Sequence, residues 1–267
     1  MGIVNATPDS FSDGGRHLDP DAALAHARRL IAEGADILDI GGESTRPGAE
    51  PLDAATEIGR VVPVIRALRA EIGIPISVDT MKPEVARAAV AAGATIWNDV
   101  TALRHAADSL AAAAGLGCQV VLMHMQGEPR SMQAEAHYDD VAREVTAFLA
   151  RRAEAAIAAG VKPERIWLDP GIGFGKHMIR HNLPLLAALD RIVALGFPVL
   201  LGASRKSFIS AVDGGGRAPD ERLGGSIAAA LVGAAAGVSA VRVHDVRETV
   251  QALRVWDAVA QAGARAL

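Results

Sequence analysis

One segment near the middle of the chain combines a carboxylate, three glycines and a lysine, in the order Asp169-Pro170-Gly171-Ile172-Gly173-Phe174-Gly175-Lys176. It follows the short apolar run 165–168, which is typical of a β-strand. An Asp at the carboxyl end of a strand points to the place where ligands bind in α/β folds. Glycines let the backbone approach a flat or anionic ligand closely. Taken alone, the segment is equally compatible with a glycine-rich turn that ends in a surface lysine.

Polar residues follow other short apolar runs of the chain in the same way. They are Asn5, Asp39, Glu43, Ser44, Thr45, Arg46, Asp79, Asn98, Asp99, His124, Gln126, Ser204, Arg205, Lys206, Arg242 and His244. Carboxylates and amides such as Asp79, Asn98 and Asp169 can bind the edge of a planar heterocycle. Cations such as Lys206 and Arg242 suit phosphates or a carboxylate. The set therefore predicts two ligand chemistries, a polar heterocycle and anions.

Several of these residues also fit a purely structural role. Asp39 is better explained by capping of a neighbouring loop or by an ion pair with an arginine than by ligand contact, and Asp99 can be a turn residue. His124 fits a core or supporting histidine better than a metal ligand. Arg242 and His244 share one face of a strand, where the alternative is a buried ion pair with a carboxylate. We favour ligand binding for both, because they face the same opening as the other cations.

The elements that must position these side chains alternate along the chain. Short apolar runs predict strands at Gly2–Asn5, Ile37–Ile40, Ile76–Val78, Ile96–Asn98, Gln119–Met123, Ile166–Leu168, Val199–Leu201 and Ala240–Val243. Segments of helical period predict helices near Asp21–Glu33, Ala54–Glu71, Pro83–Ala92, Ser109–Leu116, Asp139–Ala159, Leu183–Leu195, Leu223–Ala236 and Arg247–Ala264. Eight such units in 267 residues match a (β/α)8 TIM barrel, with a doubly wound open sheet as the alternative. We expect residues 1–267 to form a single domain.

Composition narrows the function classes. Half of the residues are hydrophobic but only 3% are aromatic, which favours helices packed on a parallel sheet. The net charge of −4 gives no support to nucleic-acid binding. Cys118 is the only cysteine, which excludes an intramolecular disulfide and a cysteine-based metal site. We find neither a signal peptide nor a membrane-spanning run, and we expect a cytoplasmic protein.

Three long loops follow strand ends, at Ala6–Pro20, Gly41–Leu52 and Gly202–Arg222. Loops of this length in compact domains usually cover or bind ligands. We expect the first to be mobile without ligand. The sequence contains no evident nucleophilic triad and no HExxH motif, whereas a Mg²⁺ held by ligand phosphates and one protein oxygen, from Asn5, is compatible with it.

Together the strand-end motifs resemble the dihydropteroate synthase family over essentially the whole chain. The matching segments are residues 2–15, 39–48, 77–80, 98–100, 122–127, 169–176, 204–207 and 242–246. The family fold is a (β/α)8 barrel, in agreement with the strand count. The family joins 6-hydroxymethyl-7,8-dihydropterin diphosphate to para-aminobenzoate, with release of pyrophosphate, in folate synthesis. The resemblance also implies a homodimer and Mg²⁺ as cofactor.

The resemblance implies a role for each matching residue. The pterin would be held by Asp79, Asn98, Met123, Asp169 and Lys206. The diphosphate would be bound by Asn5, Arg242 and His244, with Mg²⁺ at Asn5. The aminobenzoate pocket would be shaped by Thr45, Arg46, Pro47, Phe174, Lys206 and Ser204. Catalysis by an SN1-like path would involve Asp13, Lys206 and Asp169, with Asp13 facing the cation when the first loop closes.

Two other functions remain as alternatives. Methyltetrahydrofolate–corrinoid methyltransferases share the barrel and a pterin site, but the pair Arg242 and His244 and the run Ser204–Lys206 argue against them. A catalytically silent pterin-binding relative is the second alternative. One departure from the family is that Gly2 already lies in the first strand, where family members usually carry about ten more residues that seal the barrel base. We expect this difference to affect stability more than the chemistry of the site.

Overall fold

The computed structural model describes residues 1–6, 20–44, 51–127, 132 and 136–265. Its strands are β1 (Gly2–Asn5), β2 (Leu38–Gly41), β3 (Ile76–Asp79), β4 (Ile96–Asp99), β5 (Gln119–Met123), β6 (Ile166–Asp169), β7 (Leu200–Leu201) and β8 (Ala240–Val241). Every predicted strand is present. The first loop, for which we expect mobility, lies almost entirely outside the described residues.

The strands close into a ring. β1 to β6 form a parallel sheet in sequence order, and β7 pairs in parallel with β8. Isolated parallel bridges, Gly2 with Val243 and Leu168 with Val199, join the two sheets at both edges. The bridge at β8 includes a hydrogen bond of 3.1 Å from the Ile3 N–H to the Val243 carbonyl. The described residues therefore form the predicted (β/α)8 barrel.

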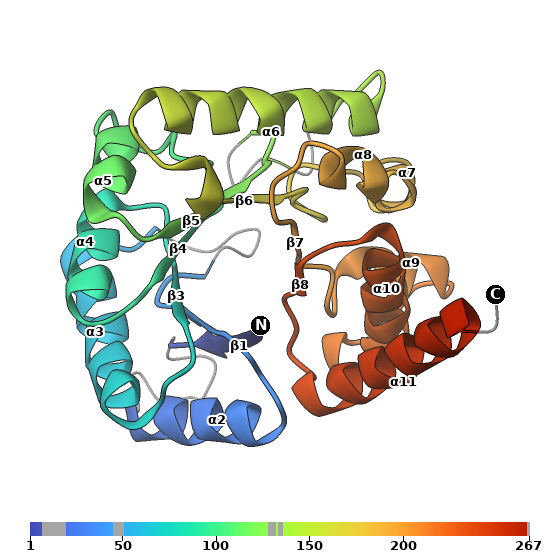
Figure 1. The fold of residues 1–267 in the computed structure, drawn as a ribbon, viewed down its shortest axis with the longest axis horizontal. Coiled ribbons are helices and arrows are strands. Elements are labelled where there is room, and N and C mark those ends of the chain that lie inside the picture. Colours follow the sequence, from blue (N-terminus) through green and yellow to red (C-terminus); the bar gives the residue numbers. More distant parts are fainter. Residues whose placement is uncertain (7–19, 45–50, 128–131, 133–135, 266–267) are drawn as a thin grey trace.

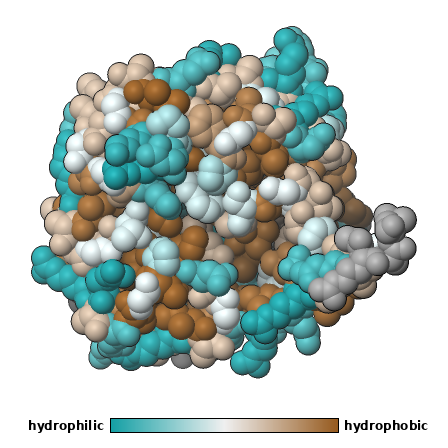
Figure 2. Space-filling model, viewed as in Figure 1, coloured by the Kyte–Doolittle hydropathy of each residue, from teal (hydrophilic) through white to brown (hydrophobic). Residues whose placement is uncertain are grey.

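Helices surround the strands (Figure 1). They are α2 (Pro20–Ala32), α3 (Ala54–Glu71), α4 (Pro83–Ala91), α5 (Ser109–Leu116), α6 (Val141–Ala158), α7 (Asn182–Ala187), α8 (Leu189–Val193), α9 (Ser207–Val212), α10 (Leu223–Ala236) and α11 (Val246–Arg265), with 3₁₀ turns η1 (Pro163–Arg165) and η2 (Pro219–Arg222). On the face of the molecule shown in Figure 2, hydrophilic residues gather toward the edge, and hydrophobic residues are exposed between polar ones toward the middle. No helix among these residues is long and apolar enough to cross a membrane.

Two predictions of element boundaries were wrong. The single helix expected at Leu183–Leu195 is divided into α7 and α8, because Ala188 has φ −115° and ψ 24°, outside the helical region. The third long loop contains α9 and η2, and α9 gives the segment 202–222 a hydrophobic anchor in Phe208 and Ile209.

The barrel interior has an apolar lower layer and a polar upper layer. Met1, Ile96, Val121 and Leu200 form a buried cluster, and the half-buried Ile37, Trp167 and Ala240 pack against it. Because side chains alternate between the two faces of a strand, the residue two positions later points to the same interior. These next residues are Ile3, Asp39, Asn98, Met123, Asp169, Gly202 and Arg242. The alternation of the strands thus gathers the polar candidates above an apolar floor.

Candidate active site

Arg242 connects three strand ends inside the barrel. Its Nε donates to Asp39 Oδ2 at 2.5 Å, and its Nη2 donates to Asp79 Oδ2 at 2.7 Å. The same Asp39 oxygen accepts a hydrogen bond of 3.2 Å from Asn98 Nδ2. The strand register supports this arrangement, since Asp79 lies directly beside Asn98 in the sheet. Residues of β2, β3, β4 and the end of β8 therefore share one polar network.

This network contains the ion pair that we considered as the structural role of Arg242. Asp39 is completely buried, and its pairing with an arginine is confirmed. Burial raises the pKa of Asp79 and is the largest influence on it, while the Arg242 guanidinium acts in the opposite direction. The Asp39 and Asp79 carboxylates raise the pKa of Arg242 against the effect of its burial.

A second group forms around Asp169 at the end of β6. Its Oδ1 accepts a hydrogen bond of 2.7 Å from the Gly171 N–H. Lys206 Nζ donates to the Ile172 carbonyl and lies 4.5 Å from the centre of the Phe174 ring. Burial raises the pKa of Asp169, and the Lys206 cation opposes this. Burial lowers the pKa of Lys206 to about 8, and the Asp169 carboxylate opposes that shift.

These two groups are adjacent. A Cβ added to Gly202 would lie 3.8 Å from Asp169 Oδ2 and 4.0 Å from Arg242 Cδ. Glycine at this position therefore keeps the space between the two groups open. Asp79, Asp169, Lys206 and Arg242, which come from separate regions of the sequence, lie at one end of the barrel.

A methionine-rich cluster borders the same opening. Met123, Met125 and Met132 form a buried group with Val100, and the half-buried Phe174 packs against it. Met123 lies beside Asp169 in the register of β5 and β6. Methionine side chains adapt readily to flat apolar surfaces, so this cluster can line the face of a ring whose polar edge meets the carboxylates.

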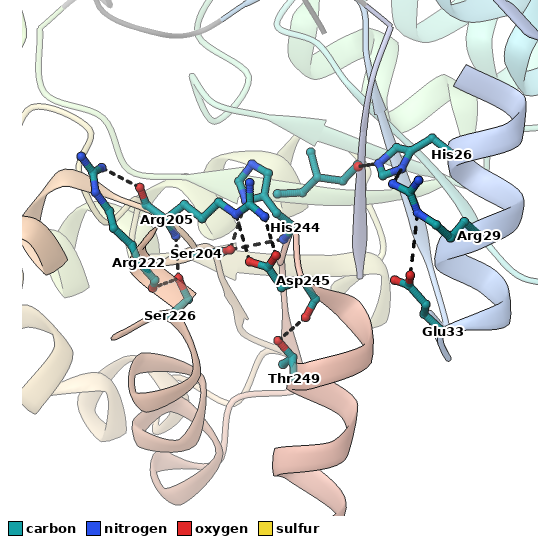
Figure 3. Close-up of polar contacts among 11 residues, drawn as sticks. His26, Arg29, Glu33, Ser204, Arg205, Arg222, Ser226, His244, Asp245 and Thr249 are labelled. Atoms are coloured by element: carbon teal, nitrogen blue, oxygen red, sulfur yellow. Dashed lines mark hydrogen bonds and ion pairs between the residues drawn. The ribbon is translucent and has the colours of Figure 1, made fainter. Parts of the chain in front are cut away.

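The ends of β7 and β8 are cross-linked by side chains (Figure 3). Ser204 Oγ lies 3.0 Å from His244 Nδ1 and also accepts a hydrogen bond of 3.2 Å from the His244 N–H. Arg205 forms a two-point ion pair with Asp245. Ser204, which we assigned to the aminobenzoate pocket, is thus placed beside a residue assigned to the diphosphate. The two cross-links fix the positions of Lys206 and His244 relative to each other.

Arg205 has a left-handed backbone, with φ 59°. Its N–H donates to Ser226 Oγ at 2.9 Å, and its carbonyl accepts a hydrogen bond of 2.8 Å from Arg222 Nη1. These contacts, visible in Figure 3, satisfy both backbone groups of a residue in an unfavourable conformation. The preceding and following side chains, Ser204 and Lys206, depend on this turn.

A cavity of about 690 Å³ lies beside this cross-link. Its lining residues are Ile3, Asn5, Ala22, Ala25, His26, Arg29, Leu30, Glu33, Arg205, His244, Asp245 and Glu248. It brings Asn5 and His244 together, two of the residues assigned to the diphosphate. On the α2 side, Arg29 Nη2 lies 2.6 Å from His26 Nδ1 (Figure 3). Asp79, Asp169 and Lys206 are not among the lining residues of this cavity, so it adjoins residues that we assigned to the diphosphate rather than those that we assigned to the pterin.

The donor set suits a metal ion that is bound mainly by a ligand. No group of three or more histidine, cysteine, aspartate or glutamate side chains among the described residues is arranged to hold a metal. The Asn5 amide oxygen is a hard ligand on the wall of the cavity, and Mg²⁺ commonly keeps its waters and binds phosphate oxygens with few protein ligands. The residues present therefore fit a phosphate-bound Mg²⁺.

Four assigned site residues, Asp13, Thr45, Arg46 and Pro47, lie outside the described residues. The flanks of the segment 45–50 are held by Glu43. Its Oε1 accepts a hydrogen bond of 2.8 Å from the Leu52 N–H, and its Oε2 lies 2.6 Å from Lys82 Nζ. Lys82 Nζ also lies 2.6 Å from the buried Glu57. This triad was not identified from the sequence, because Lys82 and Glu57 are far from Glu43 along the chain and nothing in their residue types indicates that the three meet.

Two structural interpretations were correct and one was wrong. Asp99 is a turn residue, since its carboxylate accepts hydrogen bonds from the Thr101 and Leu103 N–H groups. His124 is a buried supporting histidine, and burial lowers its pKa to about 2. The reading of Lys176 as a surface residue was wrong, because its side chain is completely buried.

Comparison with protein families gives a match to the model described as "Pterin binding enzyme" over residues 1–244. Among curated proteins, a dihydropteroate synthase of Escherichia coli (strain K12) is 47% identical over 262 residues, which cover 98% of this chain and 92% of that relative.

Solved structures give the same result. A dihydropteroate synthase of Xanthomonas albilineans with 4-aminobenzoic acid superposes with a TM-score of 0.90 at 54% identity, covering 97% of this chain and 92% of that one. A dihydropteroate synthase of Burkholderia cenocepacia complexed with 7,8-dihydropteroate gives a TM-score of 0.89 at 47% identity, covering 100% and 92% of the two chains.

Proposed function

This chain belongs to the pterin binding enzyme family, and we propose that it is a transferase that condenses 6-hydroxymethyl-7,8-dihydropterin diphosphate with para-aminobenzoate. The products are 7,8-dihydropteroate and pyrophosphate. The observation that carries the proposal is the polar layer above the apolar barrel floor, in which carboxylates, an amide and two cations meet. Relatives about half identical over nearly the full chain, with aminobenzoate or dihydropteroate named in their structures, support it.

In this proposal the pterin lies in the barrel opening. Its polar edge bonds to Asp79, Asn98 and Asp169, and Met123 packs against a ring face. Lys206 lies at the border of the two substrates, because it approaches both Asp169 and the Phe174 ring. The aminobenzoate lies against Phe174, with Ser204, Thr45, Arg46 and Pro47 as the other assigned residues. As a cation below pH about 8, Lys206 can donate hydrogen bonds to a ring acceptor.

The diphosphate lies on the side of Asn5, Arg242 and His244. Nε and Nη2 of Arg242 are bound to carboxylates, so we assign Nη1 to a phosphate oxygen. The two carboxylates hold the guanidinium plane in place before the substrate arrives. Mg²⁺ at Asn5 would supply charge neutralisation of the leaving diphosphate.

The reaction breaks the bond between the pterin methylene carbon and the diphosphate oxygen, and the electron pair leaves with pyrophosphate. The remaining cation is stabilised by conjugation with the dihydropterin, and we assign Asp13 to face it. The aromatic amine then donates its lone pair to the methylene carbon and loses one proton to solvent. Because this amine is already nucleophilic, the site needs electrostatic support and exclusion of water rather than a strong base.

The proposal also includes the organisation of the protein. We propose that residues 1–267 act as one cytoplasmic domain and associate as a homodimer. On α11, Val255 and Val259 are separated by one helical turn and are 61% and 68% exposed, and Val232 on α10 is 46% exposed. Apolar side chains of this size on one helix face are candidates for a subunit contact.

The test is release of pyrophosphate from the pterin diphosphate, with and without para-aminobenzoate, together with identification of dihydropteroate. We expect product only when both substrates are present. Measurable pterin binding without turnover would instead identify a silent pterin-binding protein and overturn the proposal.

A further inference from the structure

Lys176 has no role in the reaction proposed above, although its side chain is 0% exposed. Its Nζ donates to the carbonyl oxygens of Gly171 and Phe174, both at 2.9 Å. It also lies 2.9 Å from His124 Nδ1 and 3.3 Å from the His124 carbonyl oxygen. Burial lowers the pKa of this amine well below its usual value, and the Asp169 carboxylate acts in the opposite direction. Backbone carbonyls and an imidazole therefore replace the water around Lys176.

The acceptors come from two segments that lie directly against each other. A Cβ added to Gly171 would lie 1.9 Å from the His124 carbonyl oxygen, and one added to Gly175 would lie 2.2 Å from the Gln126 carbonyl oxygen. Only glycine permits this approach, and both positions have a positive φ, of 65° and 58°. Residues 170–175, which we call the glycine loop, therefore lie on the extension of β5 with no space for side chains between them.

The glycine loop carries groups that we assign to the substrates. The Gly171 N–H holds Asp169 Oδ1 at 2.7 Å, and its carbonyl accepts a hydrogen bond of 3.0 Å from the Phe174 N–H as well as the one from Lys176. Phe174 lies below Lys206, and Ile172 accepts the hydrogen bond from its amine. A shift of the glycine loop would move all of these groups together.

We propose that Lys176 is a positioning residue, whose amine holds the glycine loop against His124 and thereby fixes Phe174 and Asp169 at the substrates. Buried carbonyls need hydrogen-bond donors, and one amine supplies up to three at the point where the two segments meet. The identity of the substrates rests on the proposed function, whereas the geometry of the glycine loop does not.

The test compares K176M, in which the side chain stays unbranched and one atom shorter but loses its donors, with K162M as a matched control at an exposed lysine. In K176M we expect amide hydrogen exchange in residues 171–175 to accelerate at least tenfold in the unliganded protein. We also expect the KM for para-aminobenzoate to increase at least fivefold, with a smaller change in kcat. K162M should match the parent protein in both measurements.

The same substitution in a second protein, F174A, distinguishes a positioning effect on Phe174 from a general loss of stability. If Lys176 acts on aminobenzoate through Phe174, K176M should raise that KM less than twofold in a F174A protein. An equal increase in both backgrounds, or unchanged exchange in residues 171–175, would overturn the proposal. Failure of both K176M and K176Q to fold would also overturn it, because a positioning role leaves the barrel intact. Should the parent protein show no turnover, the proposed function fails, and the exchange measurement still decides the role of Lys176.

Discussion

Removal of the Asp39 carboxylate is the perturbation whose effect on stability follows most directly from the site. Asp39 is 0% exposed, and its Oδ2 accepts from Arg242 Nε at 2.5 Å and from Asn98 Nδ2 at 3.2 Å. In D39A both donors lose this acceptor inside the barrel. Arg242 keeps its second partner, Asp79, at 2.7 Å, so the guanidinium is not left without a counter-charge.

The loss in the free energy of unfolding of D39A can be derived from these contacts. A hydrogen bond to a charged group contributes about 1.5–3 kcal/mol, and we take the lower end of this range for the longer bond from the Asn98 amide. Relief of the desolvated carboxylate offsets part of the loss. We therefore expect D39A to lower the free energy of unfolding by about 3 kcal/mol. D39N keeps the shape and one acceptor, and we expect it to cost about 1 kcal/mol.

The assay is urea unfolding followed by circular dichroism, with D213A as the control. Asp213 pairs with Arg217 at 2.7 Å on the surface, where the two side chains are 59% and 51% exposed. Exposed pairs contribute little, so D213A should change the free energy of unfolding by less than about 0.5 kcal/mol. Equal losses in D39A and D213A would show that the interior network does not hold the barrel and would refute this reasoning.

Three further predictions concern activity. K206A and D169N should each lower turnover at least tenfold with the circular dichroism spectrum unchanged, a loss of about 1.4 kcal/mol or more in transition-state stabilisation; parent-like rates would remove these residues from the mechanism. Since burial lowers the pKa of Lys206 to about 8, kcat/KM should fall as the pH rises above about 8 and the amine loses its proton, and K206R should move this limb to higher pH; the same limb in K206R would contradict the assignment. R205A should raise the KM for the pterin diphosphate about tenfold by releasing the turn next to Lys206, whereas R217A should leave this KM unchanged. Steady-state kinetics of both variants checks this. Equal KM values in R205A and R217A would argue that the ion pair of Arg205 with Asp245 does not position Lys206.

The barrel and the gathering of polar residues could be predicted because both follow from local patterns. Apolar runs predict the strands, and the polar residues at the carboxyl ends of these runs predict which side chains surround the opening of the barrel. Asp39, Asn98 and Arg242 illustrate this, since each follows an apolar residue two positions earlier on the same strand face. A structural role for Asp39 was also predictable, because a buried carboxylate in a strand needs a partner, but the choice between loop capping and an arginine was not.

The partners themselves could not be predicted, because they depend on which distant segments meet. A lysine at the end of a glycine-rich turn is expected on the surface. Only the contact between the glycine loop and His124 shows why the side chain of Lys176 is buried. The pairing of Arg205 with Asp245 depends on the closure of the ring between β7 and β8. The break between α7 and α8 at Ala188 also has no signal in its residue type, since alanine favours helices.

The central claim is that side chains from separate strand ends form one site for a flat ring and an anion. The most direct test is a crystal structure with a pterin analogue and para-aminobenzoate bound together. We predict the pterin edge within hydrogen-bond distance of Asp79, Asn98 and Asp169, and the aminobenzoate ring against Phe174. A pterin bound elsewhere, for example in the cavity between α2 and His244, with the barrel opening left to solvent, would contradict the account.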